Sequence, residues 1–219
     1  MMTKRNLPIM LLVLSAGIFL AFSTLGGFKS EPTTKYEKIL RNVGTMLNEI
    51  HYSPKKIDDK FSKEIFKKFL GEIDGERGFF LQSDIDALKK YETRIDDEIN
   101  GAQIQFFPAA MEVYKKRLAE AEKIYKDILS KPFDFTKDEV ANLDYSKVEF
   151  AKNEADRKEN WRKRLKYMVL ERYSDLLDGQ EKNAGKEGFV AKTNEQLEKE
   201  ARERALKLMD RYFDRLKLK

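Results

Sequence analysis

Few residues in this chain could carry out catalysis, and the first to consider is its single histidine. His51 is the one imidazole available for a Ser-His-Asp arrangement, and it lies beside Tyr52 at the end of a predicted helix. At a helix end a ring nitrogen can bond a free carbonyl group, so we interpret His51 as a structural or surface residue. The sequence has no cysteine, which excludes a thiol nucleophile, a disulfide and a Cys-based metal site.

Serines and paired carboxylates are more numerous, but their surroundings do not favour chemistry. A Ser-Lys dyad needs a strained turn with backbone N–H groups for the oxyanion. No glycine-rich turn of that kind surrounds Ser53, Ser62, Ser83, Ser130, Ser146 or Ser174. The carboxylates Asp96-Asp97 and Asp84/Asp86 could serve glycosidic or metal chemistry, yet they are spaced like ordinary acids on helix surfaces. Phosphate-binding glycine motifs are also absent. We therefore predict no catalytic, cofactor-binding or metal-binding residue in this chain.

The aromatic and basic clusters also have a structural interpretation. Two phenylalanine pairs are more typical of a core than of a ligand site: Phe79-Phe80 and Phe106-Phe107. The segment RKENWRKRLK, residues 157–166, is basic around Trp161 and could form a patch for nucleic acid or anionic lipid. However, 43 basic residues face 38 acidic ones, and the two signs alternate along the chain. This pattern is typical of solvated helix faces, so we place Trp161 in the core and expect no nucleic-acid partner.

Residues 1–28 differ from everything that follows and read as an export leader. Lys4 and Arg5 precede the uncharged segment LPIMLLVLSAGIFLAF, and small residues follow it. This order is typical of a secretory signal peptide, although no clean A-x-A cleavage site is present. Residues 7–28 are also nearly long enough for an uncleaved anchor in the inner membrane. Both alternatives place residues 30–219 outside the cytoplasm.

The rest of the chain predicts an all-α domain of about six amphipathic helices, over residues 30–219. Apolar residues recur at three- and four-residue spacing, and Asp58 or Asp59, Ser83 and Thr193 are candidate N-caps. An extended aromatic strap is expected over residues 133–150, with a short turn at 137–142. The predicted helices cover residues 34–51, 58–73, 83–99, 105–130, 153–177 and 193–216.

Three segments together resemble the N-terminal helical domain of the tail-specific, or carboxy-terminal processing, proteases of peptidase family S41. They are HYSPKKIDDKFSKEIFKKFLGEID from His51, FFLQSDIDALKKYE from Phe79 and SKPFDFTKDEVANLDYSK from Ser130. Each segment alone is weak, because helix starts and aromatic anchors occur in many proteins. Their order makes the likeness more specific, and it extends over residues 36–216.

The resemblance implies a parent enzyme whose chemistry lies elsewhere. In that family a PDZ domain and a serine/lysine catalytic domain follow the helical domain, and the enzyme cleaves exported proteins after recognising an apolar C-terminus. Neither a PDZ carboxylate-binding loop nor a nucleophile segment is present in these 219 residues. We therefore expect this chain alone to be inert, a scaffold or adaptor-docking domain in the periplasm or envelope. The expected partners are the parent's PDZ and protease domains, an adaptor protein or a second copy. A free-standing envelope adaptor or binding protein is the alternative.

Overall fold

The computed structural model describes residues 34–217 and confirms the all-α class. Within that range no strand forms, and the only bridge of strand type joins Leu81 to Ala151. The elements are α2 (Lys35–Thr45), the π-helix η2 (Met46–Ile50), α3 (Asp59–Ile73), α4 (Gln82–Leu88), the 3₁₀ turn η3 (Lys89–Tyr91), α5 (Ile95–Ile99), α6 (Phe106–Leu129), the 3₁₀ turn η4 (Tyr145–Lys147), α7 (Glu154–Asn183) and α8 (Asn194–Lys217).

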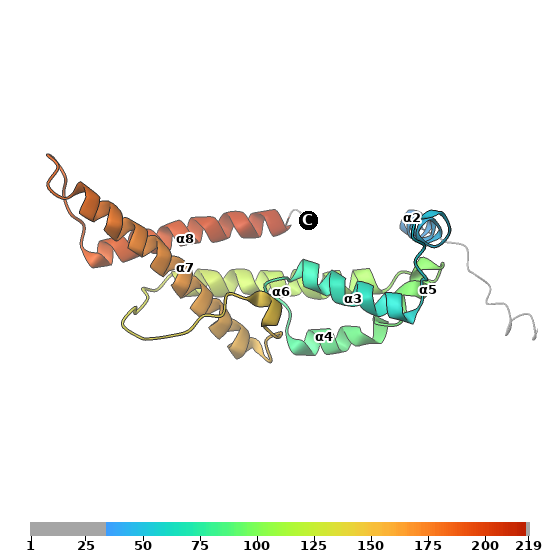
Figure 1. Ribbon diagram of the computed structural model, residues 1–219. Coiled ribbons are helices and arrows are strands. Elements are labelled where there is room, and N and C mark those ends of the chain that lie inside the picture. Colours follow the sequence, from blue (N-terminus) through green and yellow to red (C-terminus); the bar gives the residue numbers. More distant parts are fainter. Residues whose placement is uncertain (1–33, 218–219) are drawn as a thin grey trace, which may run out of the picture.

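The long helix α6 forms the spine of the molecule. In Figure 1 it runs through the middle, with α3 and α4 beside one half and α7 and α8 beside the other. The apolar face of α6 meets both groups through residues that are almost fully buried, among them Tyr114, Ala121 and Tyr125. Aromatic rings fill the centre, where Phe79 contacts Tyr114, Trp161 and Phe213 at centroid distances of 5.5, 6.3 and 6.0 Å. The core therefore joins segments that are far apart in the sequence.

Helix starts agree with the caps that the sequence suggests, with one exception. Asp58 accepts hydrogen bonds from the N–H groups of Lys60 and Phe61 and begins α3. Thr193 and Gln196 bond reciprocally at the start of α8. The prediction of Ser83 as a cap is wrong: α4 already begins at Gln82, where the Asp84 carboxylate accepts from the Leu81 N–H at 2.8 Å.

Two predicted boundaries also change. The helix expected over 83–99 is divided into α4, η3 and α5, because the chain turns between Glu92 and Arg94 to bring α5 against α3. Helix α7 continues to Asn183 rather than 177, which shortens the following loop to residues 184–193. In the strap over 133–150, the turn lies at residues 135–136 and η4 follows at 145, so the turn expected over 137–142 is misplaced.

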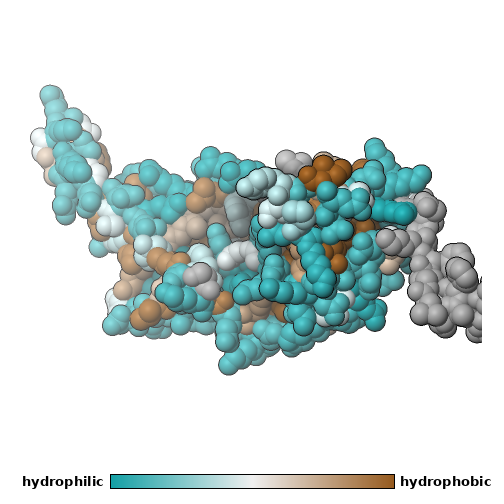
Figure 2. Space-filling model, turned by 45° about the vertical axis from the view of Figure 1, so that its right-hand side comes forward, coloured by the Kyte–Doolittle hydropathy of each residue, from teal (hydrophilic) through white to brown (hydrophobic). Residues whose placement is uncertain are grey.

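Among residues 34–217, no helix is both long and apolar enough to cross a lipid bilayer. The expected leader, residues 1–28, with its candidate anchor over 7–28, lies outside the described residues. The surface that Figure 2 shows is mainly hydrophilic, with apolar side chains gathered in patches between charged ones.

Candidate functional site

His51 has a local structural role. It ends η2 on the surface, and its Nδ1 lies 3.0 Å from the Ser53 backbone nitrogen. The Ser53 carbonyl oxygen lies 2.8 Å from the same ring nitrogen. Nδ1 can bond only one of these two groups at a time, according to the tautomer, and either bond holds the bend that follows the helix.

Ser62 is a candidate serine that is fully buried, and its side chain has a well-defined partner. Its hydroxyl donates to Asp96 Oδ1 at 2.6 Å and accepts from the Asp96 N–H at 2.7 Å. Because Asp96 lies in the first turn of α5, Ser62 supplies from α3 the capping contact that α5 lacks in its own sequence. Ser130 donates to the Asp127 carbonyl oxygen at 2.7 Å at the end of α6. Both serines are thus engaged with neighbouring helix ends.

The candidate carboxylate pairs are separated by different partners. Asp84 forms a bidentate ion pair with Arg117, with N–O distances of 2.8 and 2.9 Å, whereas Asp86 bonds Lys89 on the surface. Asp96 bonds Ser62, as described above. Within residues 34–217, no group of three or more acidic or histidine side chains is placed to hold a metal ion.

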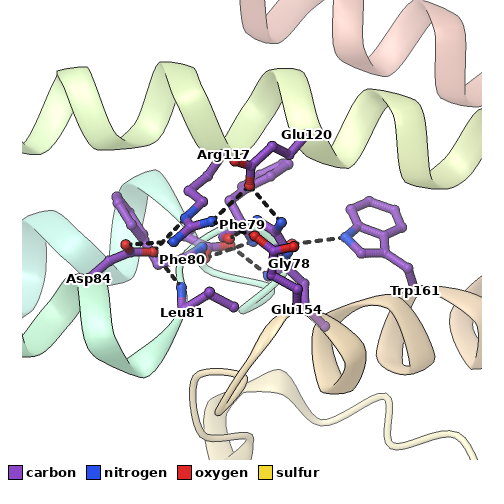
Figure 3. Close-up of polar contacts among 11 residues, drawn as sticks. Gly78, Phe79, Phe80, Leu81, Asp84, Arg117, Glu120, Glu154 and Trp161 are labelled. Atoms are coloured by element: carbon purple, nitrogen blue, oxygen red, sulfur yellow. Dashed lines mark hydrogen bonds and ion pairs between the residues drawn. The ribbon is translucent and has the colours of Figure 1, made fainter.

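The best-formed polar arrangement surrounds the connector between α3 and α4, residues 78–81 (Figure 3). Asp74, at the end of α3, is 1% exposed and accepts three backbone hydrogen bonds, from Gly78 at 2.8 Å, Phe79 at 3.0 Å and Phe80 at 2.9 Å. Burial raises the pKa of this carboxyl, and the three N–H donors oppose the rise. The connector has no regular hydrogen bonding of its own, so the Asp74 side chain substitutes for it.

Helix α7 binds the same connector from the other side. Trp161 Nε1 donates to the Gly78 carbonyl oxygen at 2.8 Å, and Arg157 Nη1 donates to the Phe79 carbonyl oxygen at 2.9 Å. A side chain at Gly78 would press on the Trp161 ring and on Arg164, since a Cβ would lie 3.3 Å from each. Glycine at this position therefore permits the close approach of α7.

An ion-pair network links α4, α6 and α7 around the connector. Glu120 Oε2 lies 2.8 Å from Arg117 Nη1 and 2.7 Å from Arg157 Nη2, and Figure 3 shows Arg117 between Glu120 and Asp84. The pKa of Glu120 is lowered, because the two hydrogen-bonded arginines outweigh the desolvation that opposes them. Arg157 is 2% exposed, so its charge is balanced inside the fold. The sequence analysis missed this network, since its residues are separated by long stretches and only the fold brings them together.

Several cations of the basic segment 157–166 have partners inside the fold. Arg157 is buried, Trp161 lies in the core as expected, and Arg162 and Lys166 both pair with Glu139 of the strap. These two cations lower the pKa of Glu139 to about 2. Internal ion pairs therefore engage Arg157, Arg162 and Lys166 of this segment.

The aromatic pairs are core residues with one exception. Phe79, Phe80 and Phe106 are buried, but Phe107 is 54% exposed and touches Phe69 only at its edge. The prediction that Phe107 belongs to the core is wrong, because adjacent residues on α6 point about 100° apart and the core covers only one side of the helix there.

Concave surface is present along α7. One groove of about 410 Å³ lies between η4, α7 and α8 and is lined by Tyr145, Arg164, Met168 and Tyr212 among others. The Arg164 guanidinium stacks on the Tyr145 ring at 4.2 Å from its centroid and donates to the Glu76 carbonyl oxygen. The groove is thus bordered by side chains that are already engaged in holding the strap to α7.

Comparison with known proteins identifies the family of this chain. The sequence model of one family, described as the tail specific protease N-terminal domain, matches residues 43–217. The chain belongs to this family. The match covers every helix from the last residues of α2 to α8, so the whole core is the family's domain.

One curated relative of this tail-specific protease domain is the tail-specific protease of Haemophilus influenzae. The two are 29% identical over 161 residues, which cover 68% of this chain and 23% of the relative. The chain therefore spans about a quarter of the length of that protein. The motifs that suggested the family have structural positions here: Asp58 caps α3, Asp84 binds Arg117, and the aromatic residues of the strap pack against α7.

Proposed function

We propose that this chain is the non-catalytic scaffold or adaptor-docking domain of an exported carboxy-terminal processing serine peptidase of family S41. The family match over residues 43–217 is the observation that carries the proposal. The fold supports it, because its best-ordered polar residues hold helices together. Asp74, Arg117 and Arg157 each bind backbone groups or carboxylates of neighbouring elements.

In this proposal, proteolysis belongs to PDZ and serine/lysine catalytic domains that work together with this one. The length of the Haemophilus relative, of which the matched region is 23%, supports this division of labour. The substrates would be envelope proteins with an apolar C-terminus, and the partners would be those domains, an adaptor or a second copy. The site of action would be the periplasm or another envelope compartment, to which the leader over residues 1–28 would direct the chain.

Such a role requires a body that keeps its shape without its partners. The centre of the fold meets this requirement, since Phe80, Leu165, Val169 and Phe213 are fully buried within the domain itself.

A complementation assay tests the proposal. The purified chain would be mixed with an unfolded reporter that ends in an apolar tail, with and without the PDZ and catalytic domains of a tail-specific protease. We expect no cleavage by the chain alone and faster cleavage by the catalytic domains when the chain is added. Turnover by the chain alone that co-purifies with it through several columns would overturn the non-catalytic role. Binding to an envelope protein without any effect on cleavage would favour a free-standing adaptor instead.

A further inference from the structure

We propose that the outer face of α2 and η2 docks on an anionic lipid surface. Five side chains on this face are largely exposed although they are apolar or aromatic. They follow one another at three- and four-residue spacing: Tyr36 74%, Ile39 48%, Val43 44%, Met46 57% and Ile50 70% exposed. Tyr52, just after the helix, is fully exposed. We call these six residues the α2 stripe.

The α2 stripe is not the face with which α2 holds to the domain. That contact includes Gly44, which lies directly against the Ile99 side chain of α5, and the partly buried Leu40 of α2 packs against the core. A Cβ at position 44 would overlap the Ile99 methyl group, so the helix can approach α5 only on its glycine side. The stripe therefore points away from this contact and has no cover within residues 34–217.

The charges around the α2 stripe suit an anionic surface. Lys35 and Lys38 lie in the first turn of α2, and Lys55 and Lys56 follow the end of η2, all exposed. The acids nearest to them in the sequence are Glu49 on η2 and Asp58, which pairs with Lys56 at 3.4 Å. Amphipathic helices that lie in a bilayer interface combine an apolar face with basic residues beside it. Tyrosine is also favoured at the headgroup level, and Tyr36 and Tyr52 stand at the two ends of the stripe.

The position of α2 in the molecule and in the sequence also favours a membrane as its binding surface. Helix α2 lies at one end of the molecule, remote from α7 and α8, so a flat surface could reach it (Figure 1). In the sequence, only residues 29–34 separate it from the apolar leader segment over 7–28. A chain that keeps the leader, or that is released beside the membrane, holds α2 close to the lipid headgroups.

The shape of the helix argues against a second helix as the occupant. Coiled-coil partners need continuous α-helical geometry as well as a 3.5-residue spacing, and the π-helix η2 departs from that geometry from Met46 onward. A lipid surface imposes no register, so it accepts the stripe with its change of pitch. The inference does not depend on the proposed role in proteolysis, since it concerns only where α2 binds.

A single-cysteine probe tests the inference in the full chain. The sequence has no native cysteine, so Val43→Cys can be labelled with nitrobenzoxadiazole at one site, and Lys63→Cys on the exposed side of α3 serves as the matched control. Each protein would be added to vesicles of phosphatidylglycerol or phosphatidylcholine with brominated acyl chains. We expect quenching of the label at position 43 in phosphatidylglycerol, weaker quenching as salt rises, and little quenching at position 63 in either lipid. The control at 63 separates docking of α2 from simple tethering by the leader.

Charge removal gives a second readout. Lys35→Gln with Lys38→Gln should lower the ratio of quenched to unquenched label by about 30-fold at low salt, which corresponds to about 1 kcal/mol for each lysine near an anionic surface. The pair Lys63→Gln with Lys67→Gln should leave that ratio unchanged. Equal quenching at positions 43 and 63 would overturn the inference. A blue shift of the fluorescence emission of the label at position 43 would also overturn it, if the shift depended on protein concentration and was insensitive to brominated lipid. Such a shift would indicate that a protein occupies the stripe.

Discussion

The connector over residues 78–81 and helix α2 use their surroundings in opposite ways. The connector is irregular backbone, yet it is buried, and side chains from α4, α7 and the end of α3 bond its N–H and carbonyl groups. Helix α2 satisfies its own backbone, yet most of its apolar side chains are exposed. In the connector, other parts of the domain supply the hydrogen-bond partners that the segment lacks on its own. In α2, a regular helix presents surface that the domain does not cover.

The difference separates the residues that stabilise this domain from those available for binding. Substitutions in the connector should reduce the free energy of unfolding, whatever the partners present. Substitutions in the α2 stripe should leave that free energy almost unchanged and alter binding. The four predictions below test this contrast, from the largest expected effect to the smallest.

Asp74→Ala should produce the largest loss of stability. It leaves three buried N–H groups, those of residues 78, 79 and 80, without an acceptor, and each such group costs about 1–3 kcal/mol. We expect the free energy of unfolding in urea to fall by about 4 kcal/mol. Asp74→Asn keeps one acceptor oxygen and should lose about half as much. A loss below about 1 kcal/mol for Asp74→Ala would mean that the connector does not depend on this carboxylate.

Arg117→Met should cost about 3 kcal/mol, because it leaves the partly buried Asp84 without its bidentate partner. Addition of Asp84→Asn should restore part of the loss, since the orphaned charge is then removed. The neighbouring Lys116→Met, on the exposed side of α6, should change stability by less than about 0.5 kcal/mol. Equal effects at 116 and 117, measured by urea unfolding, would contradict a role for the ion-pair network.

The helices could be predicted from the sequence, because the information for them is local. Apolar spacing, Pro108 in the first turn of α6 and caps such as Asp58 and Thr193 act within a few residues. The break between α4 and α5 was missed because tertiary contact with α3 divides a continuous amphipathic pattern. The same limit applies at Ser62, which caps a helix 34 residues away.

The polar network and the exposed stripe could not be separated by pattern alone. The apolar residues of α2 have the same spacing as those of α6, and only the fold decides that one set is covered and the other is not. Similarly, Arg157 and Arg162 stand in one basic run, yet the first is buried and the second is on the surface beside Glu139. The number of basic residues can be counted in the sequence, but the acidic residues that pair with them are known only from the fold.

Gly44→Ala should loosen α2 and leave the core intact. The added methyl group overlaps Ile99, and the strain should exceed the gain of about 1 kcal/mol in helix propensity by about 1 kcal/mol. Amide hydrogen exchange should therefore speed up over residues 35–50 but not over 106–129. Gly71→Ala in α3 is the control: a Cβ there meets no atom within 4 Å, so that variant should gain stability. Faster exchange throughout the chain in Gly44→Ala would show that α2 is part of the core.

Val43→Ala should have the smallest effect on stability, below about 0.5 kcal/mol, because Val43 is exposed on α2. The same substitution at Val169, which is fully buried on α7, should cost about 2 kcal/mol, since it removes apolar contacts and leaves a cavity. The two variants make the same substitution at different places. The ratio of their losses in the free energy of unfolding therefore measures how much each helix relies on its valine for stability. For binding to phosphatidylglycerol vesicles the order of the two effects should reverse: Val43→Ala should weaken binding, whereas Val169→Ala should not. If Val43→Ala were as destabilising as Val169→Ala in the absence of lipid, the stripe would already be covered within the domain, and α2 would have no free face to offer.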